Sequence, residues 1–178
     1  MILFFSGSAT FIGGRNHMEY DIQKTDIGPI LAGADGEGLR YISFQKGTHP
    51  MDIPGEWTPN EKFLKPVFDQ IHAYFHGELT CFDLTLAPMG TQFQQSVWAA
   101  LLDISYGKTA SYGQIATAIG NPKACRAVGG ANGRNPISLI IPCHRIIGAS
   151  GKLTGYGSGL PIKEKLLGLE AKYFHGRS

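Results

Sequence analysis

The sequence predicts an α+β protein in which a small α/β domain, residues 1–88, precedes a mostly helical domain, residues 89–178. Three observations predict this order. Alternating apolar and polar residues with turn signals fill the stretch 20–44, and apolar residues recur at helical spacing in two later stretches. A pair of short helices joined by a Gly/Pro turn is then expected within 111–131. The length of 178 residues suits two small domains packed together.

Residues 20–44 are expected to form two or three antiparallel strands. Three short runs carry the alternating or apolar pattern of strands: 20–27, 29–34 and 39–44. Asp35 and Gly36 provide a turn signal between the second run and the third. The next stretch, 47–60, is rich in proline and glycine and is expected to be a loop.

A helix is expected after Asn60, whose side chain can cap it. Its apolar residues recur at a spacing of three to four: Phe63, Leu64, Val67, Phe68, Ile71, Tyr74 and Phe75. Pro66 lies inside this stripe, so the helix either starts later or kinks there. Gly77 is expected to end the helix, and residues 82–86 have the pattern of one more strand. We find no recognisable chemistry in this half and interpret it as a scaffold.

The boundary between the two domains is expected within residues 87–91, which contain a proline and a glycine. Thr91 can cap a second helix whose apolar residues share one face: Phe93, Val97, Trp98, Leu101 and Leu102. Residues 111–119 and 123–131 are expected to form two short helices around a Gly-Asn-Pro turn. This arrangement is the outline of a helix-turn-helix.

Charge is distributed unevenly along the chain. Residues 1–106 contain six Lys/Arg and twelve Asp/Glu, a net charge of −6, whereas residues 107–178 contain ten Lys/Arg and two Asp/Glu, a net charge of +8. A basic half beside an acidic half is typical of a protein that binds a polyanion, although solvated lysines explain it equally well. Small residues dominate the second short helix and would let its backbone approach a partner such as DNA.

Three cysteines are too few for a disulfide framework and lack the paired spacing of a structural zinc site. We therefore expect a reducing, cytoplasmic setting, with no metal and no cofactor. Cys81 is expected to be buried in a strand, and Cys125 to have a packing role. No apolar run approaches the roughly 20 residues of a membrane span. Residues 1–18 are interpreted as a disordered or added tail rather than a targeting signal.

The strongest chemical signal is the segment Pro142-Cys143-His144-Arg145, which follows the apolar run 137–141. That run has the pattern of a buried strand. The proline favours a turn, and the neighbouring imidazole and guanidinium favour the nucleophilic thiolate of Cys143. The segment alone leaves two interpretations open, a reactive thiol and a small structural cysteine. Because adjacent residues of an extended segment point apart, contact between Cys143 and His144 would require a water or a turn.

Further motifs lie in a fixed order between Gly90 and Glu170. They are Gly-Thr-x-Phe-Gln-x-x-Val-Trp at 90–98, Ser-Tyr-Gly-Gln-Ile-Ala at 111–116, Arg-Ala-Val-Gly-Gly-Ala at 126–131, Asn-Pro at 135–136, Ile-Pro-Cys-His-Arg at 141–145, Gly-Tyr at 155–156 and Leu-Leu-x-Leu-Glu at 166–170. Each alone is only suggestive. The ordered set closely resembles one family, the O6-alkylguanine-DNA alkyltransferases, or methylated-DNA–protein-cysteine methyltransferases. The first half resembles that family in general layout, which implies a ribonuclease H-like domain.

The resemblance implies direct-reversal DNA repair. Cys143 would accept the alkyl group from guanine O6, His144 would act as a base through a water, and Glu170 would orient His144. On residue pattern alone, Glu170 is more typical of a solvated carboxylate at a helix end. An S-alkyl cysteine is a thioether with no easy hydrolytic return to thiol, so each molecule would act once. The alkyl sizes accepted, and activity on O4-alkylthymine, stay open.

The resemblance also implies a pocket for the flipped base. Tyr112 would donate a proton or hydrogen bond to the base, although alone it is typical of a half-buried helix residue. Asn135 would brace the helix-turn-helix against the active-site segment. The walls of the pocket would come from Pro142, Ile146, Tyr156, Gly157 and Ser158.

The expected partner is double-stranded DNA containing O6-alkylguanine, bound by a monomer. A guanine inside a duplex cannot present its alkyl carbon to a buried thiol, so the nucleotide must leave the stack. The resemblance implies that the second short helix enters the minor groove and that Arg126 fills the gap. Alone, Arg126 is typical of a phosphate contact or a solvated cation. The other expected DNA contacts are Ser111, Tyr112, Ala127, Gly129, Gly130, Ala131 and Arg134.

Three other functions are compatible with parts of the sequence. A non-enzymatic lesion-binding relative would lack the cysteine, so Cys143 argues against it. A helix-turn-helix regulator would explain the basic half but not the Pro-Cys-His-Arg segment. A cysteine hydrolase would explain Cys143 and His144 but not Arg126.

Overall fold

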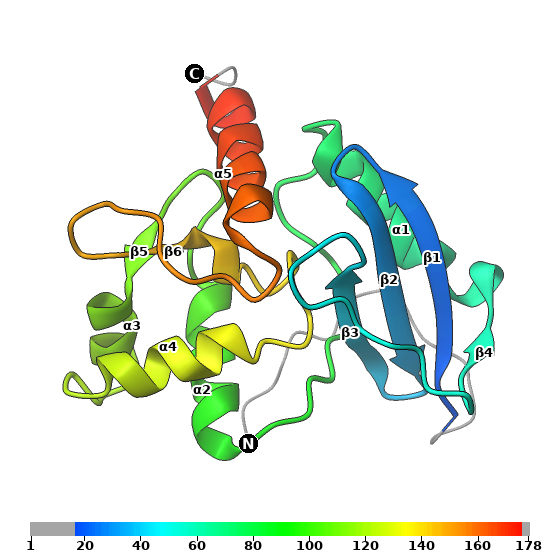
Figure 1. Ribbon diagram of the computed structural model, residues 1–178, viewed down its shortest axis with the longest axis horizontal. Coiled ribbons are helices and arrows are strands. Elements are labelled where there is room, and N and C mark those ends of the chain that lie inside the picture. Colours follow the sequence, from blue (N-terminus) through cyan, green and yellow to red (C-terminus); the bar gives the residue numbers. More distant parts are fainter. Residues whose placement is uncertain (1–16, 176–178) are drawn as a thin grey trace.

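The computed structural model describes residues 17–175, in which a sheet and a group of helices lie side by side (Figure 1). The sheet contains β1 (Glu19–Thr25), β2 (Gly28–Asp35), β3 (Gly38–Phe44) and the short β4 (Thr58–Pro59). Its strand order is β3-β2-β1-β4, with β1, β2 and β3 antiparallel and β4 parallel to β1. The three expected strands are confirmed, whereas the two-residue β4 falls in the stretch expected to be a loop.

Helix α1 (Glu61–Phe75) packs across β1 and β2. The Asn60 side chain accepts a hydrogen bond from the backbone N–H of Phe63, which caps the helix as expected. The helix begins at Glu61 and continues through Pro66, so it does not start later. Its apolar face is buried, and Gly77, with φ of 73°, follows the helix end.

Four further helices form the second half: α2 (Gln92–Leu102), α3 (Tyr112–Ala118), α4 (Cys125–Gly133) and α5 (Leu160–His175). Capping boxes start α2 at Thr91 and α3 at Ser111. Helices α3 and α4 pack on each other and on α2, which confirms the predicted helix-turn-helix. The α+β class is therefore confirmed. Two short parallel strands, β5 (Ala110–Ser111) and β6 (Ile146–Ile147), also form.

Two predicted strands are wrong. Residues 82–86 form no regular strand, because their pairing is limited to a bridge between Leu86 and Leu39. The run 137–141 is buried but turns, with a single bridge from Ile137 to Ile42 and a positive φ of 74° at Leu139. Leu84, Leu86 and most of the run 137–141 are buried, but apolar content cannot distinguish a buried strand from a buried turn.

Strand β3, at one edge of the sheet, connects the two halves of the molecule. The backbone N–H of Leu39 donates to Thr85 O, and that of Ile42 donates to Pro136 O. The N–H of Ser138 returns a hydrogen bond to Ile42 O. Strand β3 thus holds the start of the segment that leads directly into Cys143, and one apolar core runs through both halves.

Candidate active site

Cys143 lies at the start of a short 3₁₀ helix, η1 (Cys143–Arg145), directly after Pro142. The residue is 3% exposed. Asn135 positions the thiol, because its Nδ2 lies 3.0 Å from Cys143 Sγ and donates to Ile141 O at 2.8 Å. The Asn135 Oδ1 also accepts from the N–H of Ile137 at 3.0 Å. The Asn135 side chain therefore ties the turn before the cysteine to the cysteine itself, while its expected role of bracing the helix-turn-helix stays a prediction.

Burial and hydrogen bonding shift the pKa of the Cys143 thiol in opposite directions. Burial raises the pKa of Cys143, while the hydrogen bond from Asn135 and the charge of Lys163 oppose that rise. Lys163 is fully buried, and its ammonium donates to the carbonyls of Ile146 and Thr154. Lys163 is thus a cation whose charge favours the thiolate of Cys143, while the guanidinium of Arg145, which the sequence suggested for this part, is bound to Glu170.

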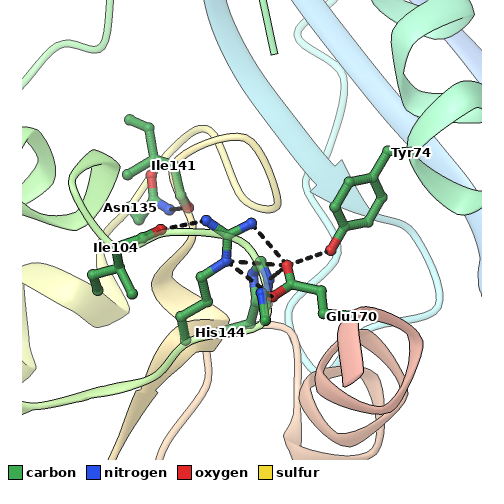
Figure 2. Close-up of polar contacts among 8 residues, drawn as sticks. Tyr74, Ile104, Asn135, Ile141, His144 and Glu170 are labelled. Atoms are coloured by element: carbon green, nitrogen blue, oxygen red, sulfur yellow. Dashed lines mark hydrogen bonds and ion pairs between the residues drawn. The ribbon is translucent and has the colours of Figure 1, made fainter. Parts of the chain in front are cut away.

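The turn of η1 directs His144 toward Glu170 of α5, as Figure 2 shows. The His144 Nε2 lies 2.9 Å from Glu170 Oε1, and both residues are buried, at 0% and 1% exposure. The His144 Nδ1 is buried and has no hydrogen-bond partner among the described residues. Burial lowers the pKa of His144, and Glu170 opposes the shift. Glu170 is therefore not the solvated carboxylate that residue pattern alone suggested.

Arg145 also binds Glu170 rather than the thiol. Its Nε and Nη2 lie 2.8–3.1 Å from the carboxylate oxygens, and its Nη1 donates to Ile104 O at 2.6 Å. Burial alone would raise the pKa of Glu170, but the hydrogen bonds and charges of His144 and Arg145 outweigh it and lower that pKa to about 2. Glu170 thus stays ionised, and its charge is fully partnered.

The sequence analysis missed Tyr74 and Lys163 as parts of this site. Tyr74 of α1 donates from its hydroxyl to Glu170 Oε1 at 2.7 Å (Figure 2). A tyrosine within the apolar stripe of α1 was the available signal, since a buried phenol needs a hydrogen-bond partner. Lys163 carried no signal, because lysine at a helix start is usually solvated.

The residues predicted to form the base pocket differ in how far they are buried. Pro142 and Ile146 flank η1 and are buried, while Gly157 and Ser158 are partly exposed. Tyr156 is 9% exposed, and its hydroxyl has no hydrogen-bond partner of good geometry in the described part. Burial and the nearby Cys143 raise the pKa of Tyr156.

The tip of the loop 156–159 is held by the N-terminal half. The N–H of Thr48 donates to Ser158 O at 3.1 Å. Tyr112 contacts the loop that follows β6, where its hydroxyl accepts from Thr154 Oγ1 at 3.3 Å. The structure therefore brings Tyr112 into contact with this loop through Thr154, while its contact with a base stays a prediction.

The predicted DNA-contacting residues cluster on α3 and α4. Arg126, Ala127 and Arg134 are exposed, and Ser111, Tyr112, Gly129 and Gly130 are partly exposed. Ala131 is buried, and its carbonyl accepts a hydrogen bond from Trp98 Nε1 of α2. Ser111 already uses its hydroxyl to cap α3.

Two expectations about the other cysteines are wrong. Cys81 and Cys125 are both exposed, because residues 82–86 do not form the strand that would bury Cys81 and because Cys125 starts α4 at its surface. Within residues 17–175, no group of three or more metal-ligating side chains gathers, and no helix is long and apolar enough to cross a bilayer. The predicted tail is described only at residues 17 and 18, and the rest of it lies outside the described residues.

A helix-turn-helix beside a buried thiol, with a histidine–carboxylate pair next to it, defines a class: nucleic-acid-binding proteins that carry a cysteine nucleophile. Comparison with known proteins identifies one family within this class. Residues 92–172 match the DNA-binding domain of 6-O-methylguanine DNA methyltransferase, and residues 18–88 match its ribonuclease-like domain. The chain belongs to the 6-O-methylguanine DNA methyltransferase family, as the motifs predicted.

Named relatives cover nearly the whole chain. A methylated-DNA–protein-cysteine methyltransferase of Methanosarcina acetivorans is 59% identical over 153 residues, which are 86% of this chain and 98% of that protein. The protein of the same name from Mycobacterium tuberculosis is 50% identical, over 86% of this chain and 92% of its own length.

Solved structures agree with the fold. The crystal structure of Mycobacterium tuberculosis OGT in complex with DNA has a TM-score of 0.81 and 50% identity, covering 87% of this chain and 94% of that one. The O6-methylguanine-DNA methyltransferase of Pyrococcus kodakaraensis has a TM-score of 0.62 at 22% identity, covers 86% of this chain and 98% of that one, and supports the fold alone.

Proposed function

We propose that this protein repairs DNA by direct reversal, moving the alkyl group of O6-alkylguanine to Cys143 once per molecule. The observation that carries the proposal is the buried Cys143 thiol, held by Asn135 and placed beside the His144–Glu170 pair. The relatives named methylated-DNA–protein-cysteine methyltransferase support the same reaction.

The hydrogen bonds suggest which nitrogen of His144 acts as the base. Glu170 is ionised and can only accept, so His144 Nε2 carries the proton of their hydrogen bond. The Nδ1 then keeps its lone pair and can take the thiol proton through a water. A new S–C bond forms as the C–O6 bond breaks, and the guanine leaving group takes up a proton. Tyr112 is our proposed donor to that base, and the loop 156–159 our proposed wall for the alkyl group.

DNA binding is proposed to use α4, with Arg126 filling the space left by the flipped nucleotide. The exposed arginines of α4 and the net charge of +8 over residues 107–178 support this surface. The partly exposed glycines Gly129 and Gly130 would allow its backbone to approach the groove closely. Because minor-groove recognition is largely sequence-independent, the protein could act on lesions in many sequence contexts.

Replacing Arg126 tests this surface. We expect Arg126→Ala to weaken binding to duplex DNA containing a flipped or mismatched base about tenfold, and to reduce the slope of log affinity against log salt by about one. Fluorescence anisotropy at several salt concentrations measures both. Lys65→Ala is the control, since Lys65 pairs with Asp69 on the exposed face of α1. Equal effects of the two substitutions would exclude a specific role for Arg126.

A reducing, cytoplasmic compartment and a monomeric state complete the proposal. Transfer requires a free thiol at Cys143, and a thiol persists best in a reducing compartment. Light scattering behind a size-exclusion column, with and without DNA, tests the monomeric state.

Intact-protein mass spectrometry tests the reaction itself. The protein is mixed with excess duplex DNA containing one O6-methylguanine, beside a Cys143→Ala variant. We expect a gain of one methyl group, mapped to Cys143, that saturates at one per molecule and is absent from the variant. Binding of the DNA without a gain in protein mass would instead identify a lesion-binding protein.

A further inference from the structure

Tyr74 connects the N-terminal half to the histidine–carboxylate pair. Its side chain leaves α1 near the end of that helix and is fully buried. The hydroxyl donates to Glu170 Oε1 at 2.7 Å, across 96 residues of sequence. Figure 2 shows the ring of Tyr74 approaching Glu170 from α1, on the side of the carboxylate away from His144.

The oxygen that Tyr74 contacts is the one that binds His144. Glu170 Oε1 accepts from His144 Nε2 at 2.9 Å and from Arg145 Nη2 at 2.8 Å, in addition to the Tyr74 hydroxyl. The other oxygen, Oε2, accepts from the N–H of Gly107 at 3.0 Å and from Arg145 Nε at 3.1 Å. Tyr74 and His144 therefore hydrogen-bond the same oxygen atom, and each draws on its negative charge.

Each element packed on this carboxylate contributes a titratable, charged or backbone polar group. Helix α1 contributes Tyr74, η1 contributes His144 and Arg145, and the loop after α2 contributes the Gly107 N–H and the ring of Tyr106. Lys163 of α5 acts on His144 at longer range. Among these groups, Tyr74 is the donor to the carboxylate that comes from the N-terminal half.

We propose that Tyr74 is a positioning residue for the base of the transfer reaction. Its hydrogen bond to Glu170 Oε1 limits how strongly Glu170 stabilises protonated His144, and so sets the pH below which transfer slows. The inference rests on the proposed function and assigns a part of it to the N-terminal half.

The direction of the effect follows from the shared oxygen. A carboxylate that loses a donor concentrates more charge on its remaining partners, so the protonated form of His144 becomes more stable. The pKa of His144 then rises. Protonated His144 cannot accept the thiol proton, so the fall in rate on acidification begins at a higher pH. A stronger donor at position 74 has the opposite effect.

A purely structural tyrosine would behave differently. The ring of Tyr74 lies against Phe75, Phe82 and Tyr106, with centroid distances of 5.5, 5.4 and 5.7 Å. If these ring contacts and the structural strength of one hydrogen bond were all that mattered, removing the hydroxyl would at most lower thermal stability and would leave the shape of the pH–rate profile unchanged. The two roles therefore differ in the pH profile and not in stability.

The first experiment compares the Tyr74→Phe variant with the wild-type protein. It measures single-turnover methyl transfer from duplex DNA between pH 5 and 9, a range chosen around the ordinary pKa of histidine. We expect the acid limb of the profile to move up by about half a pH unit, which lowers the rate below that limb about threefold. The rate on the alkaline plateau should change little. Ile71→Val is the control, because it loses buried packing one turn earlier in α1 without touching Glu170.

A second variant keeps the test decisive if Tyr74→Phe folds poorly. Placing 3-fluorotyrosine at position 74 retains the ring and makes the hydroxyl a stronger donor, so the acid limb should move to lower pH. Since burial and Glu170 raise the pKa of Tyr74 well above its ordinary value, the fluorinated phenol stays protonated over this range. Profiles that coincide with wild type in both variants, or that shift equally in Ile71→Val, would overturn the inference. Absence of transfer by the wild-type protein would instead overturn the proposed function.

Discussion

Burial favours the neutral form of both acids of the site, and their partners decide the outcome. The donors and charges around Glu170 outweigh burial and lower its pKa, whereas the Asn135 hydrogen bond and the charge of Lys163 only partly oppose the rise that burial causes at Cys143. In the proposed mechanism, Cys143 therefore reacts after transient removal of its proton by His144 rather than as a standing thiolate. Glu170 depends on its charge at all times, since Arg145 would otherwise be a buried cation without a partner.

This difference predicts how stability depends on pH. Because the pKa of Glu170 is about 2 in the folded protein and 4.5 ordinarily, its contribution is complete above pH 4.5 and is lost as the pH falls toward 2. We expect a loss of about 3 kcal/mol of unfolding free energy over this range. The lowered pKa of His144 acts in the same direction, starting below pH 6.5. Urea unfolding at stepped pH values measures the loss. The Glu170→Gln variant should not show the loss of unfolding free energy below pH 4.5. If its unfolding free energy fell with pH in parallel with that of the wild type, the loss would not come from Glu170.

A second prediction concerns Asn135. Its hydrogen bond to Sγ opposes the rise of the Cys143 pKa, so Asn135→Ala should raise that pKa further. The variant also loses two hydrogen bonds to the turn, which should cost about 2 kcal/mol of unfolding free energy. Ultraviolet absorbance of the thiolate during a pH titration measures the first effect, with the Cys143→Ala double variant as the blank. An unchanged thiolate titration would mean that the contact with sulfur has no electrostatic effect.

Among the elements, helices followed their local signals more closely than strands did. Asn60, Thr91 and Ser111 each accept a backbone hydrogen bond at the N-terminus of a helix. The sequence predicts the first two as helix caps and places Ser111 at the start of a helix. These signals depend on side chains within a few positions of each other. The runs 82–86 and 137–141 have strand-like composition but pair at single positions, because β3 offers each of them only a short stretch of its edge.

The two capping boxes allow a matched comparison between elements. The hydroxyls of Ser111 and Thr91 accept from Gln114 N and Gln94 N at 3.2 and 3.3 Å. Ser111→Ala and Thr91→Ala should each lower the unfolding free energy by about 1 kcal/mol. Because α3 belongs to the proposed DNA surface and α2 supports it from behind, only Ser111→Ala should also weaken DNA binding in anisotropy measurements. If both variants bind DNA as the wild type does, Ser111 acts in capping alone.

At the scale of the whole molecule, two contacts from the N-terminal half reach the site in addition to the pairing of β3 with residues 136–138. Tyr74 binds Glu170, and Thr48 holds the pocket loop at Ser158. The interpretation of this half as a scaffold therefore needs extension, because part of the polar network of the site comes from it.

The second contact predicts a long-range effect on transfer. A Cβ atom at Gly47 would lie 2.9 Å from Ser158 O and 3.0 Å from Phe44 O, so Gly47→Ala should displace the loop 156–159. We expect transfer from O6-methylguanine to slow about tenfold, with DNA affinity nearly unchanged, because α4 does not move. Single-turnover rates and anisotropy separate the two quantities. Gly55→Ala is the control, since nothing lies within 4 Å of its Cβ position. Equal rates for the two variants would show that the loop does not depend on this contact.

The sequence by itself determined the three antiparallel strands β1 to β3, the helices α1 to α4, the caps at Asn60 and Thr91 and the reactive segment around Cys143, because periodicity, capping and motif spacing act over a few residues. It also led to the correct family through the ordered motifs between Gly90 and Glu170. Only the tertiary structure decided that the charge of Lys163 favours the thiolate, that Arg145 binds Glu170, and that Tyr74 reaches Glu170. These contacts join residues far apart in the chain, and burial changes the pKa and partners of each group in ways that its sequence neighbours do not encode.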